Sequence, residues 1–359
     1  MKLKKLFAGV VAAAMIATMS FPAFADSVNI GGNVRVGQAA PGETLTIAKT
    51  YTVNAGSFNS DNVNLELVAF EANDYVRVTD SSITDEAAEQ LRPTFTANSN
   101  ATKDDASITM TLPRYEKVGI YTYQVKEVDG GTLGMTYDDT TYTLQVRVAN
   151  KMLDGKIDPS GDKVCYVTMK ADGTKESSVK NTYNSSNLTI SKNVEGNMGD
   201  RSNGTKFNFK VTLTVPDGKT LNSTITGTNN ADVVWNEGKM VGTVTFQLSH
   251  GESFTLMNLP YDIEYTVDEM NGTTTVLNQG DKINDTYQVS YDNHKAGTIG
   301  TGEGKIAPTE GVISTTVTNT WGAEIDTGVI LDNAPYILML TVVAAGAMTL
   351  VIKKRREEE

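Results

Sequence analysis

Short runs in which apolar and polar residues alternate recur along most of this chain, and they constrain its fold more than any other feature. Alternation with a period of two is typical of strands that bury one face. Turn residues separate the runs, as at Asp172–Lys175 and Pro216–Lys219. The pattern predicts an all-β chain built from antiparallel β-sandwiches, with one helical turn expected at 85–91.

Three polar residue types recur in the same order in the two halves of the chain. The steps from Lys to Glu are 78 and 77 residues and those from Glu to Asn are 54 and 50, at Lys49, Glu127 and Asn181 and again at Lys192, Glu269 and Asn319. Repetition at nearly constant spacing indicates tandem domains. We therefore predict domains over 26–183 and 188–323, joined by the polar segment 184–187.

All six of these residues fall where strand periodicity predicts an apolar side chain. Lys49 shares a predicted strand face with Ile47, Glu127 shares one with Val125, and the other four residues follow the same phase. Burial penalises the charged form of both side chains, so it lowers the pKa of a lysine and raises that of a glutamate.

A neutral lysine is a nucleophile, and a protonated glutamate polarises an amide carbonyl and transfers protons. We predict one isopeptide bond per domain, formed with loss of ammonia: Lys49 to Asn181 assisted by Glu127, and Lys192 to Asn319 assisted by Glu269. The alternatives are a Lys-Glu ion pair with a hydrogen bond from Asn, or strands shifted by one residue so that all six side chains face solvent. The duplication favours the bonds.

The two ends of the chain carry the patterns of an N-terminal signal peptide and a C-terminal membrane anchor. Residues 1–25 combine Lys2, Lys4 and Lys5 with an apolar run and a small-residue end, which predicts a cleaved signal peptide. The uncharged segment 335–352 is long enough to span a bilayer, and four basic residues follow it at 353–356. We expect a secreted chain that is tethered at the outer face of the membrane, at least transiently.

Charge and composition exclude several kinds of partner. The formal net charge of −12 disfavours nucleic acid. Cys165 is the only cysteine, which excludes an intramolecular disulfide. His250 and His294 are the only histidines, too few for a convincing metal cluster, so no metal or cofactor is predicted.

The two trios, the YxVxE strands and the eleven-residue step from Asn181 to Lys192 resemble those of two-domain major (backbone) pilins of Gram-positive bacteria. The segment 199–213 is similar to the opening of the second domain in streptococcal pilins of that type. The resemblance implies two tandem immunoglobulin-like β-sandwich domains, each with one intramolecular isopeptide bond.

The same resemblance implies that a sortase cuts a pentapeptide like LPxTG between Thr and Gly. The aligned pentapeptide here is 324–328, with cleavage expected between Thr327 and Gly328. Ile325 and Asp326 stand where a proline is usual in the family, which leaves open which sortase reads the signal.

A lysine of the next subunit is implied as the acceptor of the cleaved chain. By its place shortly before Asn181, Lys175 resembles the donor lysine of the streptococcal pilins, although the step to Asn181 is six residues and the Tyr-Pro-Lys motif of other pilins is not present. Lys163 and Lys170 are alternatives.

We therefore predict a secreted, cell-wall-anchored backbone subunit of a pilus. Its expected partners are a sortase, identical subunits in a covalent head-to-tail polymer, minor pilins or a tip adhesin, and peptidoglycan. Its only chemistry is one self-crosslinking event per domain, so it is not a turnover enzyme. The alternative is a sortase-anchored monomeric adhesin or minor pilin that binds a host protein or glycan, and a surface hydrolase is disfavoured by the lack of an acid/base cluster.

Overall fold

The structure is a computed structural model that describes residues 37–73, 90–292 and 294–322. Within these ranges the chain is β-structured apart from two single-turn 3-10 helices, η1 (Thr228–Asn230) and η2 (Glu237–Lys239). This confirms the predicted all-β fold. Several predicted segments lie wholly or mostly outside the described residues: the signal peptide, the helical turn at 85–91, the pentapeptide 324–328, the span 335–352 and the tail 353–356.

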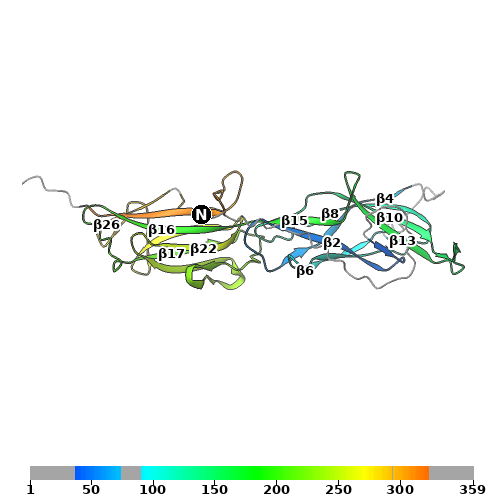
Figure 1. The fold of residues 1–359 in the computed structure, drawn as a ribbon, viewed down its shortest axis with the longest axis horizontal. Helices are drawn as coiled ribbons and strands as arrows, with labels where there is room; N and C mark the ends of the chain where they lie inside the picture. The colour runs from blue at the N-terminus through cyan, green and yellow to red at the C-terminus, as the bar shows by residue number, and fades with distance from the viewer. Residues whose placement is uncertain (1–36, 74–89, 293, 323–359) are drawn as a thin grey trace, which may run out of the picture. The chain divides into compact units, whose positions relative to one another are not determined.

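The first domain packs two sheets face to face (Figure 1). One sheet has the order β5 (Thr94–Thr96), β7 (Ser107–Thr111), β2 (Thr44–Val53), β15 (Ser178–Tyr183), β9 (Met135–Thr136). The other has the order β1 (Gly37–Ala39), β13 (Lys163–Ala171), β10 (Tyr142–Asn150), β8 (Gly119–Glu127), β4 (Leu65–Asn73), with β14 (Thr174–Glu176) also beside β13. Two smaller sheets pair β3 (Asp61–Val63) with β6 (Asn98–Ala101) and β11 (Met152–Leu153) with β12 (Lys156–Ile157).

The second domain repeats this two-sheet architecture. One sheet has the order β19 (Ala231–Asp232), β18 (Thr226–Gly227), β22 (Ser253–Pro260), β16 (Ser185–Glu195), β28 (Val312–Thr320), β26 (Tyr287–Tyr291), β25 (Lys282–Ile283). The other has the order β20 (Val234–Trp235), β21 (Val241–Leu248), β17 (Phe207–Thr214), β23 (Glu264–Asn271), β24 (Thr275–Leu277), with β27 (Ala296–Thr298) also beside β23.

Alternating burial along the strands builds the two cores. In β17 every second residue is buried, and its inward side chains are those of Phe207, Phe209, Val211 and Leu213. Each core draws on both sheets of its domain, as the period-two pattern predicts for a strand with one buried face.

Each domain places its first long strand parallel to its last strand. These pairs are β2 with β15 and β16 with β28, and every other ladder between the named strands is antiparallel. The predicted antiparallel sandwich therefore differs at this one pair in each domain. The strands of such a pair are separated by almost a whole domain of sequence, so no hairpin forces them to run in opposite directions.

The connection between the two domains is shorter than the predicted segment 184–187. Only Asn184 separates β15 from β16, and Ser185 and Ser186 are buried in the ladder with β22. The Ser186 hydroxyl donates a hydrogen bond to the carbonyl oxygen of Gly311 at 3.1 Å. Serine therefore continues the strand here, because its hydroxyl finds a partner in the turn that precedes the neighbouring strand.

Cys165 lies on β13 within the core of the first domain. Its side chain has no exposed area, and burial raises the pKa of its thiol to about 12. The folded protein therefore holds this thiol in an unreactive, protonated form.

We expect a thiol-specific reagent at pH 8 to leave Cys165 unmodified in the folded protein and to modify it fully in denaturant. Mass spectrometry of the protein after timed exposure measures both. A Ser160→Cys variant, with its thiol in an exposed turn, is the positive control. Modification of folded Cys165 as fast as that control would contradict the register of β13.

Candidate functional site

In the first domain, the lysine and the asparagine of the predicted trio come from the parallel pair β2 and β15. Lys49 lies opposite Val179 in the register, whereas Asn181 lies opposite Tyr51. The asparagine is therefore two residues further along the common strand direction than the lysine. Because side chains alternate between faces with a period of two, this stagger keeps both on the core-facing side.

The second domain repeats the stagger with the same size and direction. Lys192 on β16 lies opposite Val317 on β28, and Asn319 lies opposite Val194. The two sites thus share one backbone geometry, although they belong to different domains.

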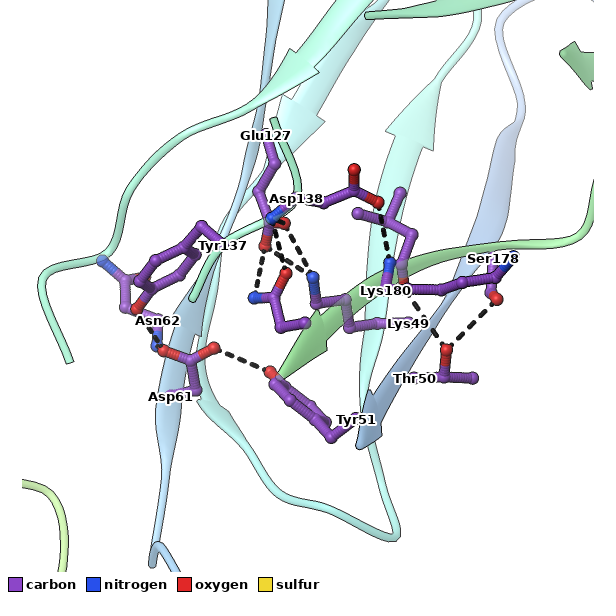
Figure 2. Close-up of polar contacts among 12 residues, drawn as sticks. Lys49, Thr50, Tyr51, Asp61, Asn62, Glu127, Tyr137, Asp138, Ser178 and Lys180 are labelled. Atoms are coloured by element: carbon purple, nitrogen blue, oxygen red, sulfur yellow. Dashed lines mark hydrogen bonds and ion pairs between the residues drawn. The ribbon is translucent and has the colours of Figure 1, made fainter. Parts of the chain in front are cut away.

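Each glutamate comes from the opposite sheet of its sandwich. Glu127 is the last residue of β8, and its carboxylate oxygens lie 2.7 and 2.8 Å from Nζ of Lys49 (Figure 2). The Nδ2 amide of Asn181 donates to Oε1 of the same carboxylate at 3.0 Å. The side chains of Lys49 and Glu127 have no exposed area. One carboxylate therefore contacts both the amine and the amide, away from water.

The second trio has the same connectivity. Nζ of Lys192 lies 3.1 Å from Oε2 of Glu269 on β23, and Nδ2 of Asn319 donates to Oε1 of Glu269 at 2.7 Å. All three residues are buried. The structure thus brings together the three predicted residues of each domain, while formation of the bonds stays a prediction.

Burial opposes the charged form of every lysine and glutamate in these trios. Desolvation lowers the pKa of Lys49 and raises that of Glu127, and their mutual attraction only partly offsets both shifts. In the second domain, desolvation lowers the pKa of Lys192 to about 8 and raises that of Glu269. Burial therefore favours transfer of the lysine proton to the glutamate in each pair.

Aromatic rings pack against both amines. Nζ of Lys192 lies 4.5 Å from the ring centroid of Phe207 and 5.8 Å from that of Phe209. Nζ of Lys49 lies 5.5 Å from the ring centroid of Tyr51. These rings exclude water while tolerating the positive charge of the unreacted lysine.

Sequence reasoning missed Asp61, a buried carboxylate on β3 near the first trio. It accepts hydrogen bonds from the hydroxyls of Tyr51 at 2.9 Å (Figure 2) and Thr132 at 2.8 Å. Its negative charge raises the pKa of Lys49, against the larger effect of burial. The signal was present, because Asp61 shares its strand face with buried Val63.

Two of the three candidate donor lysines are neighbours in the first domain, and the third lies at the other end of the same strand. Lys175 on β14 is the register partner of Lys170 on β13, and Lys163 begins β13. All three are partly exposed. The predicted cleavage residues and the two departures from the family pentapeptide lie outside the described residues: Thr327, Gly328, Ile325 and Asp326.

The two histidines make isolated contacts. Nδ1 of His250 accepts a hydrogen bond from the backbone N–H of Val194 at 3.0 Å, and Nδ1 of His294 lies 2.9 Å from the carbonyl oxygen of Ser314. Among the described residues, no cluster of three or more His, Cys, Asp or Glu side chains is arranged to hold a metal ion. In the same part of the chain, we find no helix with the length and apolar character needed to cross a membrane.

Comparison with known proteins matches both domains. Residues 46–184 match the family described as "Spy0128-like isopeptide containing domain", and residues 186–321 match a domain family of unknown function. The chain is similar to the major pilin of Streptococcus pyogenes, with a TM-score of 0.48, 22% identity, and coverage of 79% of this chain and 99% of that one. It is also similar to the S. pyogenes major pilin T3.2, with a TM-score of 0.47, 20% identity and the same coverage.

Sequence identity to a curated relative decides the family. The chain is 30% identical over 247 residues to a protein named "Pilin" from Streptococcus pyogenes serotype M1. The alignment covers 67% of this chain and 69% of that protein. The resemblance noted from the paired trios is thereby confirmed, and the chain belongs to the pilin family.

Proposed function

We propose that each sandwich forms one internal isopeptide bond, Lys49 to Asn181 in the first domain and Lys192 to Asn319 in the second. The observation that carries this proposal is the shared glutamate, which contacts the amine and the amide of its own trio in both domains. An ion pair alone does not need an asparagine amide against the same carboxylate. Two such arrangements with the same stagger support a common reaction.

The reaction needs only the three side chains. The Lys49 ammonium gives a proton to Glu127, and the free amine attacks Cγ of Asn181, so that the Nζ–Cγ bond forms and the carbonyl π electrons move to Oδ1. Glu127 then protonates Nδ2, and the Cγ–Nδ2 bond breaks with release of ammonia. Glu127 recovers a proton from the new amide nitrogen, so the balance is one ammonia lost per bond. Glu269 plays the same part in the second domain.

The expected energetic benefit lies in the unfolded chain. Each bond would close a loop of about 130 residues, and loop entropy then stabilises the folded state by roughly 4 to 5 kcal/mol per bond. Such a protein gains the effect of a disulfide without a second cysteine.

We further propose that the chain is the backbone subunit of a sortase-polymerised pilus anchored to the cell wall. Membership of the pilin family supports this role over that of a monomeric adhesin. Thr327 would supply the acyl group, and Lys175 would accept it on the next subunit. Minor pilins, a tip adhesin and peptidoglycan are the further partners that this role implies.

The exported body should weigh less than its sequence by one ammonia for each domain. Glu127→Ala and Glu269→Ala should each retain one ammonia and unfold at lower temperature, because the proton carrier of one site is lost. Intact-mass measurement and thermal unfolding test both statements. Glu66→Ala, an exposed glutamate on β4, is the matched control and should lose both ammonia molecules. A wild-type mass equal to the unmodified sequence would refute the bonds.

Asn319→Ala should expose the cost of burying an unreacted lysine. Because the folded pKa of Lys192 is about 8 and its ordinary value is 10.5, the unfolded chain binds more protons between these pH values. The free energy of unfolding should therefore rise by up to about 3 kcal/mol as pH rises from 8 to 10.5, and this contribution should be flat below pH 8, where both states bind the proton. Urea titrations at several pH values measure this. The double variant Lys192→Met with Asn319→Ala should not show this rise in the free energy of unfolding. An equal dependence of that free energy on pH in the two variants would contradict the assignment to Lys192.

Native cells should display the subunit as a ladder of high-molecular-weight species that resists boiling in detergent. Lys175→Ala should abolish the ladder, whereas Lys163→Ala and Lys170→Ala should leave it intact, because only the donor amine resolves the acyl-enzyme. Immunoblots of cell-wall extracts provide the measurement. No ladder from the unmodified chain would instead support a monomeric adhesin.

A further inference from the structure

The first trio has a backbone neighbour, Asp138, for which the second trio shows no counterpart among the residues that the structure describes. Asp138 lies between β9 and β10, and its backbone N–H donates to Oδ1 of Asn181 at 2.9 Å and to Oε2 of Glu127 at 3.1 Å. Figure 2 shows this nitrogen beside the Glu127 carboxylate. One backbone donor therefore contacts both the carbonyl that would be attacked and the carboxylate that would carry the proton.

From this geometry we propose that the Asp138 N–H stabilises the oxyanion that forms on Asn181 during crosslinking, and that the Asp138 carboxylate and Tyr142 are positioning residues for the first bond only. The inference rests on the proposed isopeptide function. It adds the Asp138 N–H, which contacts a reacting atom, and two side-chain groups, the Asp138 carboxylate and the Tyr142 hydroxyl, which hold that N–H in place.

The donor is suited to the charge that develops in the reaction. When Nζ of Lys49 bonds to Cγ, the carbonyl π electrons move to Oδ1, and a fixed N–H within about 2.7 to 3.1 Å of that oxygen stabilises the transition state more than the ground state. Glu127 competes for the same N–H while it is ionised. Once it has taken the lysine proton it is a weaker acceptor, so the N–H is released to Asn181 at the step that needs it.

The side chain of Asp138 fixes the direction of its own N–H. Its carboxylate accepts hydrogen bonds from the backbone N–H groups of Thr140 and Lys180, each at 3.0 Å, and from the hydroxyl of Tyr142. Figure 2 shows the carboxylate turned toward Lys180, which is next to Asn181 on β15. These bonds connect the segment that carries the donor to the strand that carries the acceptor.

The charge state of Asp138 agrees with this role. Burial on its own would raise the pKa of the carboxyl, but the hydrogen bonds from Thr140, Tyr142 and Lys180 hold it below the ordinary value. The carboxylate is then ionised at neutral pH and accepts all three bonds at once.

The second domain offers no equivalent donor in the part of the chain that the structure describes. Oδ1 of Asn319 is buried and has no hydrogen-bond partner there. The only side-chain donors to the Glu269 carboxylate there are Lys192 and Asn319. The second site is thus an internal control, since it shares the trio and the stagger but lacks the backbone donor.

The test follows bond formation in each domain of the full chain after cell-free synthesis. Samples are denatured at intervals, digested, and analysed by mass spectrometry for the branched peptide of each domain. Replacing Asp138 by its α-hydroxy acid exchanges the N–H for an ester oxygen and keeps the side chain. We expect the first bond to form about 100-fold or more slowly, as for loss of one oxyanion donor, while the second bond forms at the wild-type rate.

Tyr142→Phe tests the positioning role without changing the trio. It keeps the buried ring and removes only the hydroxyl that contacts Asp138, so the first bond should slow by about 10-fold, within the range typical of positioning effects. Tyr121→Phe is the matched control, because it removes another hydroxyl donor of a buried tyrosine in the same domain, one that contacts the carbonyl oxygen of Lys117. It should leave both rates unchanged.

The outcomes separate the two levels of the proposal. If wild type and the ester variant form the first bond at the same rate, the oxyanion role is wrong although the crosslinks stand. If Tyr121→Phe slows the first bond as much as Tyr142→Phe, the effect is general destabilisation and the positioning role is wrong. If wild type forms neither bond, the proposed function fails first. The ester variant decides the oxyanion role even where Tyr142→Phe does not fold.

Discussion

Between two packed β-sheets, a lysine ammonium and a glutamate carboxylate lose their hydration. Both domains depend on the contacts that compensate this loss. Lys49 and Lys192 stay enclosed because each contacts a carboxylate from the opposite sheet. The same enclosure shifts the pKa values of both partners toward their neutral forms, which are the forms that acyl transfer to an amine requires. The desolvation that makes the buried ion pair costly therefore also favours the protonation states that the proposed crosslinking needs.

Much of this site could be predicted because strand phase is a strict constraint. A slip of one residue would have exposed Lys49 together with its apolar neighbour Ile47, so phase placed all six trio residues on the core side. Phase does not reveal which strands are neighbours, and the parallel pairing of β2 with β15 depends on closure of the whole domain. Asp138 left no signal in the sequence, because it acts through a backbone N–H that every residue except proline possesses.

The duplicated trio does not have duplicated surroundings. The negative charge of Glu127 raises the pKa of Lys49 against the effect of burial, and the carboxylates of Asp61 and Asp138 raise it further. Among the described residues, Glu269 is the one carboxylate that raises the pKa of Lys192, whose Nζ also packs against the rings of Phe207 and Phe209. If both proposed bonds form, the amine and the carbonyl would therefore react in different electrostatic surroundings in the two domains. Equal residue types therefore do not imply equal rates.

The two-residue stagger has a mechanical consequence in the second domain. In a pilus under load, tension enters β16 at its N-terminal end and leaves β28 at its C-terminal end, so the two parallel strands are sheared past each other. Asn319 is already ahead of Lys192 in that direction, by about 6.6 Å along the strand. Once the proposed bond forms, it is a diagonal tie that stretches from the first displacement, with no slack to be taken up by rotation. A stagger of the opposite sense would let the strands slide before the tie resisted.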